Sequence, residues 1–158
     1  MDFFSEALLS GKTEKIPEAY DWFAPLIGDW DCDYYDEPEK GQKRRVKGEW
    51  IFRRILEGTG VQDVFIFPSR STKETEPQPD GEYGTSLRMF NREKGWYDVV
   101  YTCERCMKRL TFRKGRRQAC RKGTGRGKRV LDLLRSGTGP VPVGKRTDPG
   151  RRFKGTDL

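Results

Sequence analysis

A few polar side chains lie inside aromatic and β-branched runs of the sequence, where they could orient a bound molecule. Asp63 belongs to Val-Gln-Asp-Val-Phe-Ile-Phe at 61–67, and Arg88 to Thr-Ser-Leu-Arg-Met-Phe at 85–90. Small-molecule sites are mostly apolar with a few placed polar groups, and a partly desolvated arginine can hold a carboxylate through two hydrogen bonds. We therefore predict a site for a small apolar or amphipathic ligand, and its candidate residues are Trp50, Phe52, Asp63, Phe65, Arg88, Phe90 and Tyr101.

These runs also predict which side chains share a face. Successive side chains of a strand point to opposite sides, so every second residue lies on one face. The faces expected for the site are Val46, Gly48, Trp50 and Phe52; Asp63, Phe65 and Phe67; Ser86, Arg88 and Phe90; and Trp96, Asp98 and Val100. A slip by one residue would reverse any of these faces, and ordinary core packing is the alternative role for the same side chains.

The composition argues against an enzyme. The chain has no histidine, which removes the commonest general base and the commonest metal ligand. Ser-His-Asp and Cys-His catalysis are thereby excluded. Asp63, Asp98 and Tyr101 could serve acid–base roles, but nothing in their spacing indicates such chemistry. We predict a binding protein without a catalytic group.

The cysteines include one pair at metal-ligand spacing, Cys103-Glu-Arg-Cys106. A structural zinc site needs four ligands. Cys120 could supply a third, Cys32 is distant in sequence, and there is no second C-x-x-C. We expect no metal and no cofactor, and cysteines that stay as thiols in a cytoplasmic protein. The N-terminus has no positively charged region followed by an apolar stretch, and it therefore predicts a cytoplasmic location.

Charge divides the chain into two unlike parts. Residues 1–103 hold 14 Lys and Arg against 20 Asp and Glu, whereas residues 104–158 hold 18 against 4. High net charge with few apolar residues favours disorder, so we expect 104–158 to be a mostly disordered basic tail. The tail could bind nucleic acid non-specifically through phosphates, which is the alternative function. It could also be a merely solvated tail, or the product of a shifted reading frame.

The first part has the pattern of an antiparallel sheet. Short helical segments are expected at 2–9 and 17–26, with Pro17 at a favourable first helical position. Aromatic and β-branched runs then alternate with turn residues. The strands predicted from them are 30–35, 46–56, 61–67, 85–90 and 96–103, with a long polar loop at 69–83. Consecutive strands with short reversals predict an up-and-down meander.

The order of these segments resembles a known family. Gly28-Asp29-Trp30 opens the first strand just after a helical segment. Together with Gly48-Glu49-Trp50-Ile51-Phe52, the run 55–64 and the strands at 84–90 and 95–101, it is similar to a lipocalin-like (calycin) group of bacterial β-barrel proteins of unassigned function. The resemblance covers about residues 20–103, and it implies structural roles for Gly28 and Trp30, with the tryptophan packed across the closed end of the barrel.

The resemblance implies a ligand-binding barrel with a closed floor and an open mouth. Such barrels close with roughly eight strands, whereas five are predicted here. We therefore expect one lipocalin-like portion at 1–103, a barrel or an incomplete half-barrel, followed by the tail at 104–158. Order should end near Glu104, which would leave 96–103 as an unpaired sheet edge able to drive self-association.

Overall fold

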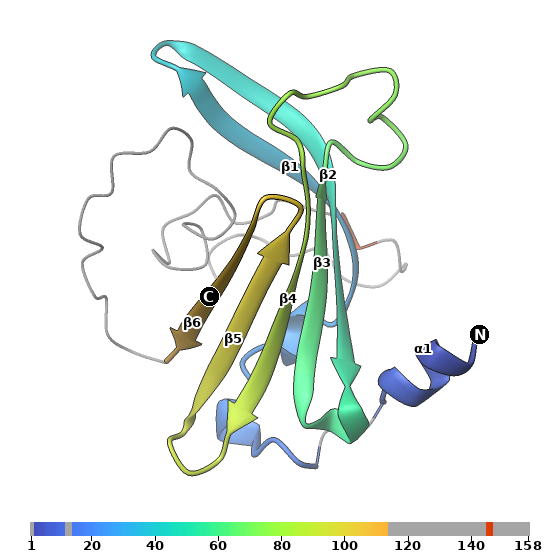
Figure 1. The fold of residues 1–158 in the computed structure, drawn as a ribbon, viewed down its shortest axis with the longest axis vertical. Coiled ribbons are helices and arrows are strands. Elements are labelled where there is room, and N and C mark those ends of the chain that lie inside the picture. The colour runs from blue at the N-terminus through green and yellow to red at the C-terminus, as the bar shows by residue number, and fades with distance from the viewer. Residues whose placement is uncertain (1, 12–13, 114–144, 147–158) are drawn as a thin grey trace.

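The structure is a computed structural model, and it describes residues 2–11, 14–113 and 145–146. Its main feature is one antiparallel sheet in which the first six strands pair in the order of the chain, each with the next (Figure 1). Its strands are β1 Gly28–Glu39, β2 Gln42–Ile55, β3 Gly60–Phe67, β4 Glu82–Asn91, β5 Trp96–Cys103, β6 Cys106–Phe112 and the two-residue β7 Lys145–Arg146. The predicted mainly β, up-and-down meander is confirmed.

The sheet is open over the described residues. The strand order runs β6-β5-β4-β3-β2-β1-β7, so β6 and β7 stand at its two ends. β7 is held to β1 only through the partners Trp30↔Arg146 and Asp31↔Lys145. Strand length is greatest in β1 and β2, whose hairpin extends beyond the rest of the sheet at the upper end of Figure 1.

One face of the sheet, here called the inner face, carries the core. Along β2, Val46, Gly48, Trp50, Phe52 and Arg54 are buried, while the residues between them are more exposed. The strand registers carry the same face across the sheet. Its other buried members are Trp30, Cys32, Tyr34, Val61, Asp63, Phe65, Phe67, Ser86, Arg88, Tyr97, Val99 and Tyr101.

The structure contains a sixth strand that the sequence did not predict. β6 pairs with β5 along its length, from Tyr97↔Phe112 to Cys103↔Cys106. The expectation that order ends near Glu104 and leaves β5 as an unpaired edge is therefore wrong. Lys108 and Arg109 hide the strand pattern, because an outermost strand tolerates charged side chains that a central strand would not. Leu110 and Phe112 still pack against the buried core.

The predicted face of β5 is also wrong. Tyr97, Val99 and Tyr101 are buried, whereas Asp98 is exposed on the opposite face. The loop after β4 sets this register, because it makes Phe90 the partner of Tyr97 and Asn91 the partner of Trp96. A one-residue difference in the loop moves every side chain to the other face. Trp96, Asp98 and Val100 therefore do not line the inner face.

The N-terminal segment covers one end of the inner face. α1 spans Phe3–Leu8, and the predicted helix at 17–26 is instead two 3₁₀ turns, η1 Glu18–Tyr20 and η2 Ala24–Leu26. Pro25 lies within η2, where a proline offers no backbone N–H. We call the cluster at this end the floor; its rings are Tyr20, Trp22, Phe23, Phe90, Tyr97 and Phe112.

Trp30 stands where this segment meets the sheet. Its ring is 8% exposed, and its Nε1–H donates to the Leu26 carbonyl at 2.7 Å. Gly28, two residues earlier, has φ of 139°, a backbone conformation that favours glycine. The bend at Gly28 thus leads the chain from η2 into β1 with the tryptophan turned inward.

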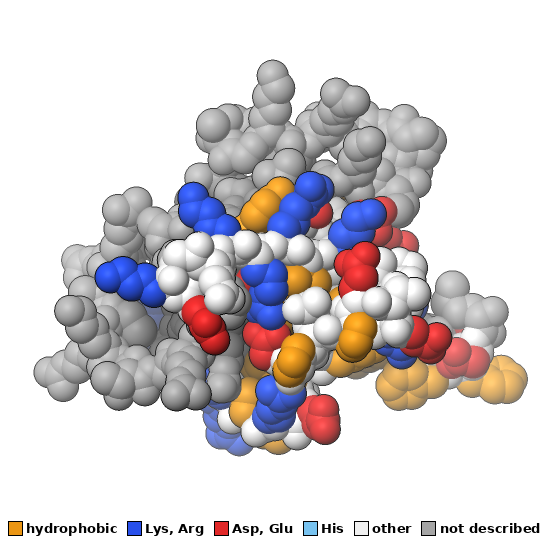
Figure 2. Space-filling view, turned by 90° about the horizontal axis from the view of Figure 1, so that it is seen from above, with side chains coloured by type: hydrophobic (Ala, Val, Ile, Leu, Met, Phe, Trp, Pro, Cys, Tyr) orange, Lys and Arg blue, Asp and Glu red, His pale blue; other side chains and the backbone are white. Residues whose placement is uncertain are grey.

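Charged side chains of both signs are spread over the opposite end of the molecule. Figure 2 shows Lys, Arg, Asp and Glu side chains interleaved there, with small hydrophobic areas between them. Within the described residues, no helix combines the length and the apolar character needed to cross a membrane.

Candidate ligand-binding site

Asp63 is the centre of a buried polar cluster on the inner face. Its Oδ2 accepts hydrogen bonds from Trp50 Nε1 and from Arg88 Nη2, the latter at 3.0 Å. Its Oδ1 accepts from the Ser86 backbone N–H at 2.7 Å. Asp63 and Arg88 are 2% and 1% exposed. Three neighbouring strands, β2, β3 and β4, thus converge on one carboxylate.

The register explains why these side chains meet. Phe52 pairs with Asp63, and Asp63 pairs with Ser86 across the next strand. Cross-strand partners and their diagonal neighbours lie on one face within side-chain reach. Arg88 is a diagonal neighbour of Asp63, and its long side chain closes that gap. A charge this deeply buried needs a partner of opposite sign, and the Arg88–Asp63 pair meets that need.

Aromatic rings enclose the Arg88 guanidinium. Its Cζ lies 5.0 Å from the centroid of the Phe23 ring and 5.4 Å from that of Phe52. Both distances lie within the range of cation–π attraction. Phe23 comes from the N-terminal segment and Phe52 from β2, so the guanidinium sits between the floor and the sheet. Its Nη1 is buried and has no hydrogen-bond partner among the described residues.

Tyr101 contributes a second buried polar atom without a partner. Its hydroxyl makes no hydrogen bond within the described part of the chain. The ring lies over Gly84 on β4, where an added Cβ would stand 2.5 Å from the tyrosine oxygen. Gly84 therefore permits this ring position, and any larger residue would displace the hydroxyl. Gly84 was missed by sequence reasoning, because a glycine in a strand carries no signal until its neighbour is known. Ser86 was expected on the same face as Arg88, but the hydrogen bond from its backbone N–H to Asp63 could not be foreseen.

The structure brings together most, but not all, of the predicted site residues. Trp50 and Arg88 each contact both Phe52 and Asp63, and Phe65 meets Trp50 edge-on with ring centroids 5.5 Å apart. Tyr101 is on the same face, opposite Ser86. Phe90 belongs to the floor, with its ring 5.2 Å from Tyr20 and 5.4 Å from Tyr97.

Two tyrosines of the inner face have raised pKa values. Burial raises the pKa of Tyr34 to about 12, and the nearby Asp36 carboxylate acts in the same direction. Burial also raises the pKa of Tyr97, whose hydroxyl donates to the Tyr20 carbonyl at 2.8 Å. Both phenols therefore remain protonated at neutral pH.

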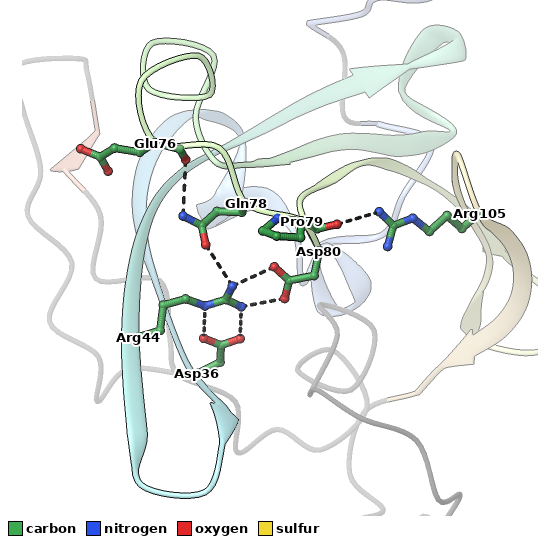
Figure 3. A network of polar contacts seen from close by, with 7 residues as sticks. All are labelled: Asp36, Arg44, Glu76, Gln78, Pro79, Asp80 and Arg105. Atoms are coloured by element: carbon green, nitrogen blue, oxygen red, sulfur yellow. Dashed lines mark hydrogen bonds and ion pairs between the residues drawn. The ribbon is translucent and has the colours of Figure 1, made fainter.

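Arg44 joins two chain segments at the charged end, as Figure 3 shows. Its guanidinium donates to Asp36 within the β1–β2 hairpin and to Asp80 in the loop before β4, the latter at 2.7 and 2.8 Å. Hydrogen bonds to Asp80 and Asp36 raise the pKa of Arg44. A third segment reaches the same loop, since Arg105 from the β5–β6 turn donates to the Pro79 carbonyl at 3.3 Å. We call this set of contacts the rim.

The described residues contain no group of three or more His, Cys, Asp and Glu side chains arranged to hold a metal ion. The predicted basic tail falls mostly on 114–144 and 147–158, outside the described residues, together with Cys120 and the expected nucleic-acid contact.

Comparison of the chain with family models, with curated proteins and with solved structures finds no match.

Proposed function

We propose that the chain is a lipocalin-like binding protein whose inner face holds a small apolar or amphipathic molecule. The observation that carries this proposal is the Arg88 Nη1 group, a buried donor without a partner in the described residues. Buried polar groups in folded proteins are nearly always hydrogen-bonded, and an exception calls for an explanation. A ligand atom that accepts a hydrogen bond would satisfy this donor, and the aromatic residues beside it would contact the rest of the ligand.

The charge of the site favours a neutral acceptor over the carboxylate expected from the sequence. Asp63 already pairs with Arg88 at 3.0 Å, so the buried pair carries no net charge. A carboxylate ligand would add an uncompensated negative charge in a low-dielectric setting, which is costly. A carbonyl or amide oxygen can accept from Nη1 without that cost. We therefore infer a ligand with a neutral polar end.

The Tyr101 hydroxyl offers a second polar contact. Arg88 and Tyr101 are diagonal neighbours on adjacent strands, since Arg88 pairs with Val99 and Ser86 with Tyr101. Diagonal neighbours have Cα atoms about 7–8 Å apart. The tyrosine oxygen lies over Gly84, further along the sheet from the floor. A ligand extended along the inner face could therefore meet both donors.

Three ligands of equal chain length test the proposal: decanamide, decanoic acid and decane. Each is titrated into the full chain at neutral pH while tryptophan fluorescence is followed, since the Trp50 indole lies in the cluster. We expect decanamide to bind more tightly than the other two. Decane has no atom that could accept a hydrogen bond from Arg88, and decanoate would bring an uncompensated negative charge into the site. Equal binding of all three would show that Arg88 anchors nothing, and the absence of binding by any would contradict the proposed site.

A further inference from the structure

The β5–β6 turn brings two cysteine side chains close together. Cys103 and Cys106 are cross-strand partners on either side of the two-residue turn Glu104-Arg105. Their Sγ atoms are 3.3 Å apart. Partners in an antiparallel ladder have Cα atoms about 4.5–5.5 Å apart, and disulfides span about 4.4–6.8 Å. The sulfurs need only close to about 2.0 Å, without a change of strand register.

The two thiols also differ from the buried Cys32 in their access to solvent. Cys103 and Cys106 are half-buried, and the turn residues between them are exposed. Cys32 is 5% exposed on the inner face, and burial raises its pKa to about 12. Thiolate is the reacting form, so Cys32 should be inert under conditions in which the turn cysteines react. The chain therefore contains its own unreactive reference thiol.

We propose that Cys103 and Cys106 form a reversible dithiol–disulfide pair that is oxidised by low-molecular-weight disulfides such as glutathione disulfide. The thiolate of one cysteine attacks a glutathione sulfur, which breaks the glutathione S–S bond and releases one glutathione as a thiolate; this thiolate takes up the proton that the cysteine had lost. The second cysteine then attacks the protein sulfur of the mixed disulfide and releases the second glutathione. Two electrons pass from the protein dithiol to the oxidant.

Oxidation at this place would fix the turn that reaches the rim. Arg105 lies between the two cysteines and donates to the Pro79 carbonyl, and the neighbouring Asp80 pairs with Arg44. A disulfide would tie β6 to β5 at the end of the hairpin that carries this contact. The two cysteines are thus a redox modification site. Their oxidation would make the rim more rigid.

Peptide mapping of the full chain tests the proposal. The protein is equilibrated with mixtures of reduced and oxidised glutathione, quenched in acid, and digested with trypsin. Because trypsin cleaves after Arg105, a bridge would link the peptide 95–105 to the peptide 106–108. We expect this linked species to form with loss of two titratable thiols, to disappear when reduced glutathione is in excess, and to leave Cys32 unmodified.

The matched variant is Cys106→Ser, which keeps the size of the side chain but removes the resolving thiol. It should accumulate the Cys103–glutathione mixed disulfide that wild type converts into a bridge. Far-UV circular dichroism checks that the variant is folded, and Cys103→Ser supplies the reciprocal experiment. The proposal is overturned if both wild-type cysteines remain thiols, if each carries its own glutathione, or if either bridges to Cys120.

Discussion

Arg88 and Asp63 are oppositely charged, and burying either one without the other would be energetically costly. Each is almost fully buried, and together with Trp50 and the Ser86 backbone they satisfy most of their hydrogen bonds. Removing one member of such a pair leaves an uncompensated buried charge. The residue types of this cluster were foreseeable from the sequence, because they are the few polar groups in apolar runs. Their pairing was not, because it depends on the register of three strands.

Asp63→Asn provides a test of the charge argument. The substitution leaves Arg88 with an unbalanced positive charge, so the free energy of unfolding should fall by about 3–5 kcal/mol. The ligand preference should also reverse, with decanoate now binding more tightly than decanamide because it supplies the missing negative charge. Urea denaturation measures the first effect and fluorescence titration the second. Glu93→Gln, at an exposed position in the β4–β5 loop, serves as the control and should change neither. An unchanged preference for decanamide would contradict the account.

Substitutions of two tyrosines on β5 should affect stability and ligand binding differently. Tyr97 donates to the Tyr20 carbonyl, so Tyr97→Phe should lower the free energy of unfolding by about 1 kcal/mol and leave decanamide affinity unchanged. Tyr101 has no partner in the described residues, so Tyr101→Phe breaks no hydrogen bond there; it should not lower the free energy of unfolding, and it should weaken decanamide binding. Urea denaturation and fluorescence titration distinguish the two patterns. The reverse pattern would show that the Tyr101 hydroxyl is structural.

At the scale of elements, the hydrophobic pattern predicts the central strands well, but it predicts their ends and the outermost strand β6 poorly. The predicted strands correspond to β1–β5, although the structure extends most of them by several residues. β6 was not predicted because Lys108 and Arg109 interrupt its hydrophobic pattern. Its pairing with β5 and the packing of Phe112 on the floor show that it belongs to the sheet. The face of β5 depended on the geometry of one loop. These features are fixed by tertiary contacts and cannot be read from a local pattern.

Phe112→Ala tests whether β6 is part of the folded core. The ring contacts Trp22 and Phe23, with centroids 5.8 and 5.2 Å apart. Because it is only partly buried, we expect a loss of about 2 kcal/mol in the free energy of unfolding, less than the ~3–5 kcal/mol typical of a fully buried phenylalanine. Urea denaturation gives the value. Met107→Ala, at a side chain that is 70% exposed, should have little effect. Equal effects of the two substitutions would remove β6 from the core.

The rim should make stability depend on acid pH. Side-chain hydrogen bonds from Arg44 lower the pKa of Asp80 below its ordinary 3.8. A carboxyl whose folded pKa is depressed stabilises the protein fully above its unfolded pKa, and this contribution is lost as pH falls through the folded pKa. Asp80→Asn should therefore reduce stability at neutral pH and flatten the pH dependence below about pH 4. Thermal melts across that range check this. If Asp80→Asn were less stable than wild type by the same amount at every pH, the ionised Asp80 carboxylate would not be the source of the stabilisation.

At the scale of the whole molecule, six strands and the N-terminal segment form an open sheet with one covered end. Small β-barrels close with roughly eight strands, whereas the described residues add only the short β7 beside β1. The floor fills the end near Tyr97, while the rim joins the hairpin, the loop and the turn at the other. Between these ends lies the cluster of Trp50, Asp63 and Arg88, where the proposed ligand would sit.

The measurement that tests this account most directly is nuclear magnetic resonance of the arginine guanidinium groups during a decanamide titration. Arg88 is the proposed anchor, and Arg54 is the internal control. Arg54 is also buried on the inner face, but both of its terminal nitrogens donate to Asp21, at 3.1 and 2.7 Å. The account predicts that the Arg88 Nη signals, assigned with Arg88→Lys, shift with ligand concentration while those of Arg54 stay in place. Unmoved Arg88 signals at saturating ligand would contradict it.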